Sequence, residues 1–377
     1  MRAWIVLATC LGLVALVVPV AGVGSAPVAD KIGKPEGKLV LLQWPGYSDP
    51  SFAADFERRT GCRITRRNAR SSEDMLDLMR SGSYDLVSAS GDISGELILQ
   101  RLVQRVDVAL IPGWKRFAKW FRSPAYNTVN GVHYGITAMW TPNELMYNMR
   151  RARPHPSSWR AVYNDRFAGK VSIPDNPMQI ADAALYLRSA EPRLEIGDPY
   201  ELTPGQFDAA TALLRRQKRL VGRYWQYASE QIQDFRTTNA VVGSSWPYQA
   251  HVLVTSGSPV RALVPAQGST AWADSWLLGA EAAHPNCAYL WLRHVSTPFV
   301  QAKQALVLRE SPVTPAACPL MNAAEKGSCA AYYGSSPPSV LRRLEFWKTP
   351  ARECGRGGRT DCVPYSEWQR AWATIRS

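Results

Sequence analysis

The chain is short of the residues and spacings that carry most metal and nucleophile chemistry. It has five histidines, and none stands in an HExxH motif or beside a Gly-x-Ser-x-Gly nucleophile turn. Its cysteines show no Cys-x-x-Cys or Cys/His zinc spacing. We therefore expect a protein that is not an enzyme and that takes no metal and no cofactor. A secreted hydrolase stays open as an alternative, because catalytic carboxylates can come together from distant positions.

Beyond its first residues the chain also lacks an apolar run of about 18 residues, so no later transmembrane helix is expected. The one long apolar run, Trp4–Val20, follows Arg2 and precedes small residues up to Ala26. This layout is typical of a secretory signal peptide, which we place at residues 1–26. The protein is then exported to the periplasm, the cell envelope or the extracellular space. Cys10 leaves membrane tethering through a lipid open.

Acidic residues are outnumbered: 31 Asp and Glu stand against 44 Lys and Arg, for a net charge of +13. The basic residues are scattered through the chain and form no recognised nucleic-acid-binding motif. We expect no nucleic-acid partner. The basic surface is interpreted as an aid to solubility or as attraction to an anionic envelope.

Cysteine is sparse but even in number once Cys10 is assigned to the signal peptide. Six cysteines in an exported chain suggest three disulfides, for which fifteen pairings are formally possible. Pairing near neighbours would close two short loops and leave one long-range bridge, although the sequence does not decide the connectivity. That arrangement would be Cys318–Cys329, Cys354–Cys362 and Cys62–Cys287.

Alternating strand and helix patterns predict an α/β fold. An apolar strand at 38–43 is followed by a helix start at Asp49-Pro50, and a third strand is expected at 84–89. Strands that alternate with helices form mainly parallel sheets, whose ligands bind at the carboxyl ends of the strands. At 377 residues the chain suits two domains better than one.

The stretch 268–278 offers a candidate binding motif. Residues two apart on a strand share a face, so Trp272, Asp274 and Trp276 would point the same way. A carboxylate beside indole rings suits an organic ammonium ion, because the acid supplies charge and the rings supply cation–π attraction. The alternative is that both tryptophans are core residues and Asp274 is a turn or cap residue.

Several short motifs, taken in order, resemble the spermidine/putrescine-binding branch of the extracellular solute-binding proteins of ABC importers. The resemblance runs through nearly the whole chain after the signal peptide. The motifs are Trp44-x-x-Tyr47, Tyr84-Asp85-Leu86-Val87-x-x-Ser90, Met139-Trp140, Ser158-Trp159, Gly169-Lys170-Val171 and Trp272-Ala273-Asp274-Ser275.

The resemblance implies a two-lobe periplasmic-binding-protein-like fold of type II, with a mixed sheet flanked by helices in each lobe. Lobe 1 would take residues 38–140 plus 265–315, and lobe 2 would take 141–264 plus 316–377. The ligand would lie in a cleft between them. The implied partners are a small cationic amine, such as a polyamine, and an ABC transporter permease. We expect a monomer.

The resemblance also implies ligand contacts at Trp44, Tyr47, Ser90, Trp246, Trp272 and Asp274, and it gives Trp276 no binding role. Three positions depart from the family. Its two acidic positions in lobe 2 fall on Asn176 and Gln179, although Asp175 is one residue away. An aromatic position of lobe 1 falls on Asp92, which could supply a replacement acid. We include all three among the expected ligand contacts.

Because Asp274 is then the main charge in the cleft, ligands with one cationic centre compete with polyamines. The alternatives are a monoamine, a quaternary ammonium ion or a zwitterion. The adjacent pair Tyr332-Tyr333 resembles the paired tyrosines of ferric-ion-binding relatives, so ferric ion is a further alternative.

Overall fold

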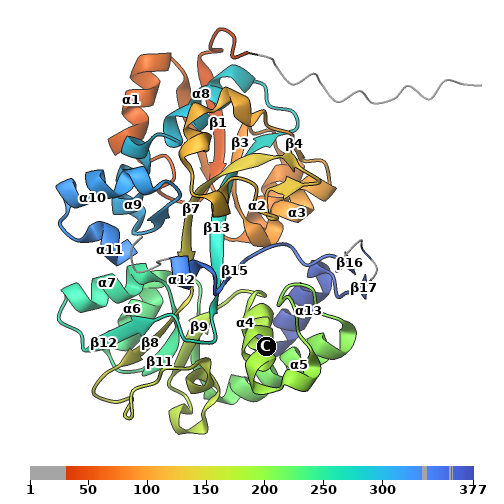
Figure 1. Ribbon diagram of the computed structural model, residues 1–377, viewed down its shortest axis with the longest axis vertical. Helices are drawn as coiled ribbons and strands as arrows, with labels where there is room; N and C mark the ends of the chain where they lie inside the picture. Colours follow the sequence, from red (N-terminus) through yellow and green to blue (C-terminus); the bar gives the residue numbers. More distant parts are fainter. Residues whose placement is uncertain (1–30, 333–337, 356–357, 359) are drawn as a thin grey trace, which may run out of the picture.

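The chain forms two α/β lobes, one above the other along the long axis of the molecule (Figure 1). The computed structural model describes residues 31–332, 338–355, 358 and 360–377. The predicted signal peptide, residues 1–26, lies outside this range. The predicted α/β class with two lobes is confirmed. In the described part of the chain, every helix is too short or too polar to cross a membrane.

The upper lobe, lobe 1, is built on a mixed eight-stranded sheet whose main path runs β14-β7-β13-β3-β1-β2. β1 is parallel to β2 and β3, whereas β13 is antiparallel to β3 and β7. The strands are β1 (Lys38–Gln43), β2 (Arg63–Asn68), β3 (Leu86–Ser90), β4 (Val103–Gln104), β7 (Gly135–Pro142), β13 (Ser269–Gly279), β14 (Ser311–Pro312) and β15 (Leu344–Phe346). The helices are α1 (Pro50–Thr60), α2 (Ser72–Ser81), α3 (Gly91–Leu99), α8 (Pro285–Val295) and α9 (Pro298–Leu308).

Lobe 2 contains a five-stranded sheet in the order β10-β9-β11-β8-β12. Its strands are β8 (Glu144–Asn148), β9 (Val171–Pro174), β10 (Val221–Trp225), β11 (Val242–Ser245) and β12 (Val260–Leu263). Its helices are α4 (Gln179–Ala190), α5 (Pro204–Gln217), α6 (Ala228–Arg236), α7 (Pro247–Thr255) and α13 (Tyr365–Arg376). Smaller elements are the hairpins β5 (Thr128–Val129) with β6 (Val132–His133) and β16 (Glu353–Cys354) with β17 (Thr360–Asp361), and the short helix α12 (Pro338–Leu341).

Local sequence signals explain the helix that follows the first strand. The side chain of Asp49 caps α1 by accepting from the Ser51 amide at 2.9 Å, and Pro50 occupies the first helical position. The helix ends at Gly61, whose φ of 76° is left-handed. The Asp49 cap fixes where α1 begins, and so it fixes the end of the loop at 44–48, from which Trp44 and Tyr47 line the cleft.

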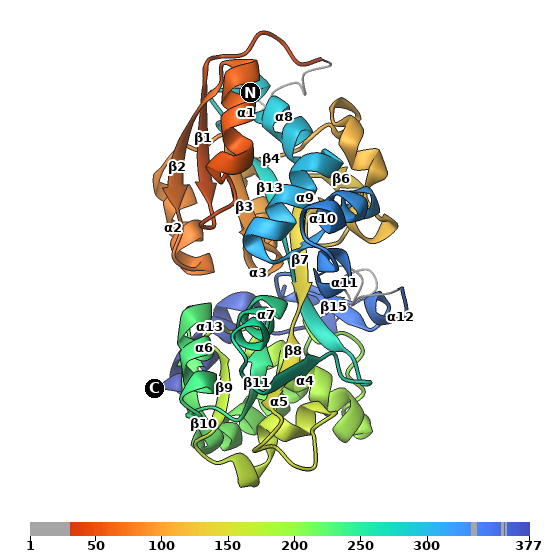
Figure 2. The ribbon, with the colours of Figure 1, turned by 90° about the vertical axis from the view of Figure 1, so that its left-hand side faces the viewer.

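The chain crosses between the lobes on two strands that lie side by side. β7 runs down from lobe 1 and continues through Asn143 into β8, as Figure 2 shows, and β13 returns beside it. All residues of both strands are buried. Asn143 links the two strands. Its side-chain amide donates to Thr270 Oγ1 at 2.7 Å, and its backbone N–H donates to the Thr270 carbonyl oxygen at 2.9 Å.

The structure divides the C-terminal region differently from the expected lobe 2 range of 316–377. Two helices, α10 (Cys318–Ala324) and α11 (Ser328–Tyr332), lie with α9 in lobe 1 (Figure 2). Met321 and Tyr332 are buried in the lobe 1 core, which is why this segment stays there. Among the described C-terminal helices, α13 packs its apolar side chains against lobe 2, where Trp368 meets Phe207 of α5 and Trp372 meets Tyr224 of β10.

Three disulfides join the six cysteines in the short-loop arrangement. They are Cys62–Cys287, Cys318–Cys329 and Cys354–Cys362. The first spans 225 residues and holds the chain after α1 to α8, and the others span 11 and 8 residues. The long-range bridge therefore fastens two distant parts of lobe 1, whereas the short ones fasten local loops.

Gly91 allows the C-terminal segment to lie directly on the start of α3. A Cβ atom at this position would stand 2.0 Å from the carbonyl oxygen of Trp347. Thr349 completes the contact, because its hydroxyl accepts from the Gly95 amide at 2.8 Å and donates to the Gly91 carbonyl at 3.1 Å. This close approach brings Trp347 beside Ser90, at the edge of the cleft.

Candidate ligand-binding cleft

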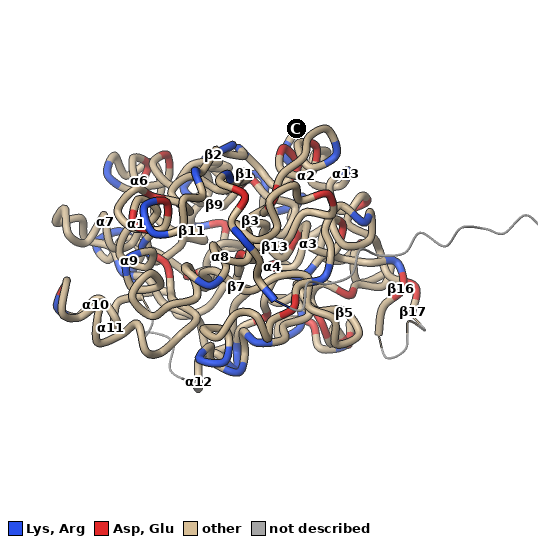
Figure 3. The backbone as a smooth tube through the Cα atoms, turned by 90° about the horizontal axis from the view of Figure 1, so that it is seen from above, with Lys and Arg blue, Asp and Glu red and all other residues tan. Residues whose placement is uncertain are grey.

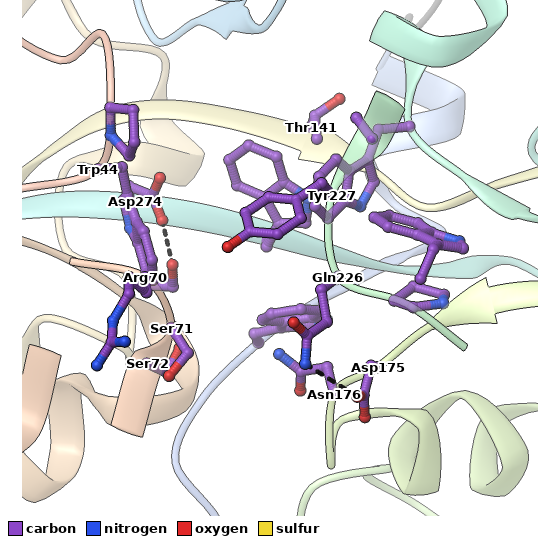
Figure 4. Close-up of a pocket in the computed structure, with 18 of the residues that line it drawn as sticks. Trp44, Arg70, Ser71, Ser72, Thr141, Asp175, Asn176, Gln226, Tyr227 and Asp274 are labelled. Carbon is purple, nitrogen blue, oxygen red and sulfur yellow. Dashed lines mark hydrogen bonds between the residues drawn. The ribbon is translucent and has the colours of Figure 1, made fainter. Parts of the chain in front are cut away.

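A cleft of about 850 Å³ is lined by residues of both lobes. Seven of the nine predicted contacts line it (Figure 4 labels several). They are Trp44, Tyr47, Ser90, Asn176, Trp246, Trp272 and Asp274. The cleft is unusually aromatic, because six of the fourteen tryptophans contribute to its walls. These are Trp44, Trp225, Trp246, Trp272, Trp347 and Trp372.

Asp92 and Gln179 are not lining residues, which corrects their predicted placement. Asp92 is fully buried in the first turn of α3, where the Tyr365 hydroxyl donates to it at 3.4 Å and burial raises its pKa to about 7. Gln179 begins α4 and donates to Asp182 at 2.8 Å. Both side chains are buried at the start of a helix, behind the wall of the cleft. Asp92 contacts Tyr365 of α13, and Gln179 contacts Asp182 of its own helix.

Trp276 is fully buried and does not line the cleft, in keeping with the absence of an implied binding role. Its ring meets Tyr47 edge-on at 6.2 Å and Trp291 at 5.9 Å. Trp276 therefore supports Tyr47 from behind. Strand β13 thus serves the cleft at Trp272 and Asp274 and the lobe 1 core at Trp276.

Asp274 lies at the centre of β13, directly opposite Ser90 in the register of the sheet. Its side chain is buried, with one oxygen accepting from the Ser90 hydroxyl and the other from the Tyr47 hydroxyl. Burial raises the pKa of Asp274 to about 6, and the two hydrogen bonds oppose that rise. The carboxylate is thus held in place by lobe 1 alone.

Glu310 is a further acid of the cleft, next to Asp274, and it was not predicted from the sequence. It follows α9 and Arg309, a left-handed residue with a φ of 58°. The Tyr47 hydroxyl lies 2.9 Å from Glu310 Oε2, across 263 residues of sequence. Burial and the charge of Asp274 raise the pKa of Glu310 well above its ordinary value. The only signal in the sequence was an acid between an apolar helix and Ser311-Pro312, which predicts no site.

The lobe 2 side of the cleft carries an acid that is already paired. Asp175 follows β9 and accepts from Trp372 Nε1 at 2.8 Å, and Arg376 forms an ion pair with it at 2.5 Å. The neighbouring Asn176 uses its side-chain oxygen to accept from the Met178 amide at 2.8 Å, just before α4. Asp175 thus restores an acidic group near the expected position, but Arg376 neutralises its charge.

Trp246 forms the aromatic link between the two lobes. It precedes α7, and its indole N–H donates to the Asn143 side chain at 3.1 Å, where the lobes join. Its ring stands perpendicular to Trp225 at 4.7 Å and close to perpendicular to Trp272 at 5.5 Å. Edge-to-face packing of this kind is favourable and holds the rings in defined orientations. A rigid apolar wall therefore faces the acids of lobe 1.

The charge pattern distinguishes the two ends of the cleft. Among the described residues, neither Asp274 nor Glu310 forms an ion pair with a cation of the protein. Asp175, by contrast, is paired with Arg376. Elsewhere, Lys and Arg are interspersed with Asp and Glu along the backbone, in the view of Figure 3. Uncompensated acids in a cleft lined by indole rings form a receptor for a cation.

The ferric-ion alternative gains no support from the described residues. Residues 31–332, 338–355, 358 and 360–377 contain no group of three His, Cys, Asp or Glu side chains placed to hold a metal. Tyr332 is buried and its hydroxyl accepts from Arg309 at 2.9 Å. Its neighbour Tyr333 lies outside the described residues.

Two lobes joined by paired crossing strands, with a cleft lined from both, define a two-lobed solute-binding protein. Comparison with known proteins then gives the family. Residues 51–326 match the bacterial extracellular solute-binding proteins, and the chain belongs to this family.

Two curated relatives are similar over most of their length. The chain is 22% identical over 341 residues to a putrescine/agmatine-binding protein of Pseudomonas aeruginosa, covering 85% of this chain and 90% of the relative. It is 23% identical to the putrescine-binding periplasmic protein PotF of Escherichia coli, covering 87% and 90%. A solved structure, a putative spermidine/putrescine ABC transporter from Listeria monocytogenes, aligns with a TM-score of 0.74 at 16% identity, covering 90% and 99%. The last likeness shows the fold.

Proposed function

We propose that this protein captures a cationic amine outside the cytoplasm and delivers it to the permease of an ABC importer. One observation carries the proposal: the buried Asp274 and the half-buried Glu310 lie without a compensating cation in a cleft walled by tryptophans. The names of the two curated relatives, which bind putrescine, support it. In this role the ligand is bound and released unchanged, so no catalytic step is assigned to any residue.

Within this class, a ligand with one cationic centre fits the cleft better than a diamine. A diamine needs an uncompensated acid at each end, and each charge-assisted hydrogen bond contributes about 1.5–3 kcal/mol. Lobe 1 supplies such acids, but on the lobe 2 side Asp175 is paired with Arg376 and Asn176 is neutral. The pairing of Asp175 with Arg376 therefore favours a monoamine or a quaternary ammonium ion over a diamine.

Thermal denaturation with a ligand panel tests the proposal. A bound amine stabilises the folded state by mass action, by about 2.7 kcal/mol when its concentration is 100 times its dissociation constant. We expect a clear rise in melting temperature with at least one of putrescine, spermidine and choline. Betaine and amino acids test a zwitterion, and ferric ion tests the metal alternative. The absence of a shift with every amine at millimolar concentration would overturn the proposal.

Removing Arg376 should move the preference towards diamines. In Arg376→Gln the Asp175 carboxylate loses its cation and faces the cleft with its charge free. We expect putrescine to gain roughly tenfold in affinity relative to a monoamine of similar size, measured by isothermal titration calorimetry. Arg370→Gln is the matched control, since it removes the same charge from the exposed side of the same helix. Equal changes in the two variants would contradict the assignment of Asp175.

A further inference from the structure

The hydroxyl of Tyr47 stands between two carboxyl groups. It contacts Asp274 Oδ2 in a short hydrogen bond and lies 2.9 Å from Glu310 Oε2. A phenol has one hydrogen to donate, and an ionised carboxylate can only accept. If both acids were ionised, one of the two contacts would bring two oxygen atoms together without a hydrogen. The geometry is satisfied when one carboxyl group carries a proton.

The surroundings of the two acids also disfavour two negative charges. Glu310 faces Asp274 and Tyr47, and Asp274 faces Tyr47, Ser90 and Trp44. Beyond these, Asp274 adds its charge to the neighbourhood of the buried Asp92 and Tyr126. Two further cations line the cleft, but Arg70 pairs with Asp74 and Arg376 with Asp175.

The cations nearest in sequence point elsewhere. Arg309 precedes Glu310, but its guanidinium pairs with Glu325 at 2.6 Å and donates to the Tyr332 hydroxyl. The ring of His251 packs against the ring of Tyr332, with the ring centroids 5.6 Å apart. Burial raises the pKa of Asp274 to about 6 and that of Glu310 well above its ordinary value. Both shifts agree with a retained proton.

We propose that Asp274 and Glu310 share one proton through Tyr47, and that the cationic group of the ligand binds between them by displacing it. This inference rests on the proposed amine-binding function and adds Glu310 to the ligand contacts. The displaced proton passes to solvent and the ammonium group takes its place, so the net charge of the site stays at minus one. The ligand drives the exchange because a nearby positive charge favours the ionised form of both acids.

Proton exchange makes binding depend on pH in a defined direction. Raising the pH removes the proton that the ligand must displace, so affinity increases by about tenfold per pH unit while the pair still holds its proton. Lowering the pH has the opposite effect. Titration calorimetry at pH 7 in two buffers of different ionisation enthalpy should show one proton released per ligand bound.

Two variants isolate the pair. In Glu310→Gln the amide donates to Tyr47, so proton release should vanish and affinity should become independent of pH over the same range. Tyr47→Phe keeps the ring against Trp276 but removes the bridge, and it should reduce the release. Glu281→Gln, which removes an acid from an exposed loop, should behave as the unmodified protein does. Melting curves confirm that each variant is folded.

An infrared measurement on ligand-free protein separates this inference from the proposed function. Asp92 and Glu144, whose pKa values burial raises to about 7, contribute such bands in both proteins. The difference spectrum at pH 7 between the unmodified protein and Glu310→Gln should therefore contain one further carbonyl stretch of a protonated carboxyl group. Amine binding with neither this band nor proton release would overturn the shared proton and leave the proposed function standing. The band without amine binding would overturn the proposed function. The loss of both would overturn both.

Discussion

We expect the replacement of Asp274 with asparagine to lower the affinity for the proposed amine ligand by at least about 30-fold. Removing one partner of a buried, hydrogen-bonded charge pair costs about 2–5 kcal/mol, and each 1.4 kcal/mol is a factor of ten. Asparagine has nearly the same shape, so Ser90 and Tyr47 keep a partner and the strand stays in register. The effect then reports lost charge rather than lost structure. Calorimetric titration of the ligand found in the panel measures it.

Asp77→Asn is the control for this variant, because it also removes one negative charge from lobe 1. Asp77 lies on the exposed side of α2 and pairs only with Arg80. Its affinity should stay within about twofold of the unmodified protein, since exposed charges separated by more than a Debye length are screened. An Asp274→Asn protein with unchanged affinity would remove the carboxylate from the binding site.

Removing the long-range disulfide should cost more stability than removing either of the two short-range disulfides. In the loop-entropy description, a bridge that closes 225 residues stabilises the folded state by about 5 kcal/mol. Both cysteines are fully buried, so the double variant Cys62→Ala/Cys287→Ala also leaves a small cavity. We expect a large fall in the midpoint of chemical denaturation under non-reducing conditions.

The double variant Cys354→Ala/Cys362→Ala provides the comparison. Its bridge closes 8 residues, for which the same relation gives about 2.5 kcal/mol. The hairpin β16–β17 that it holds lies at the surface, so its loss should leave the lobes folded. Equal effects in the two variants would mean that loop length does not govern the contribution of these bridges.

The strands and helices of lobe 1 were largely predictable because their signals are local. The apolar run 38–43 and the caps Asp49 and Gly61 correspond to β1 and α1, and 84–89 overlaps β3. The C-terminal region was less predictable. Whether α10 and α11 pack against lobe 1 or lobe 2 depends on where the chain leaves α9. No local sequence pattern predicts that position. The structure shows that they pack against lobe 1, because Met321 and Tyr332 are buried in its core.

The candidate site was likewise predictable only where a local pattern or a matching motif existed. Trp272 and Asp274 were predicted from a strand period and from a family resemblance, and both line the cleft. Asp92 and Gln179 were placed by position alone, and helix packing turned them away. Glu310 was missed because its significance comes from Tyr47, 263 residues away. The two residues meet because the sheet of lobe 1 positions Tyr47 and helix α9 positions Glu310.

The four side chains around the acid pair all belong to one lobe. Tyr47 follows β1, Ser90 ends β3, Asp274 lies on β13 and Glu310 follows α9. If the lobes turn about the crossing strands, the spacing of these groups does not change. The acids that would attract a positive charge are therefore preorganised within lobe 1. Under the proposed function, discrimination among amines falls to the far wall of the cleft, which Trp246 and Asn176 line.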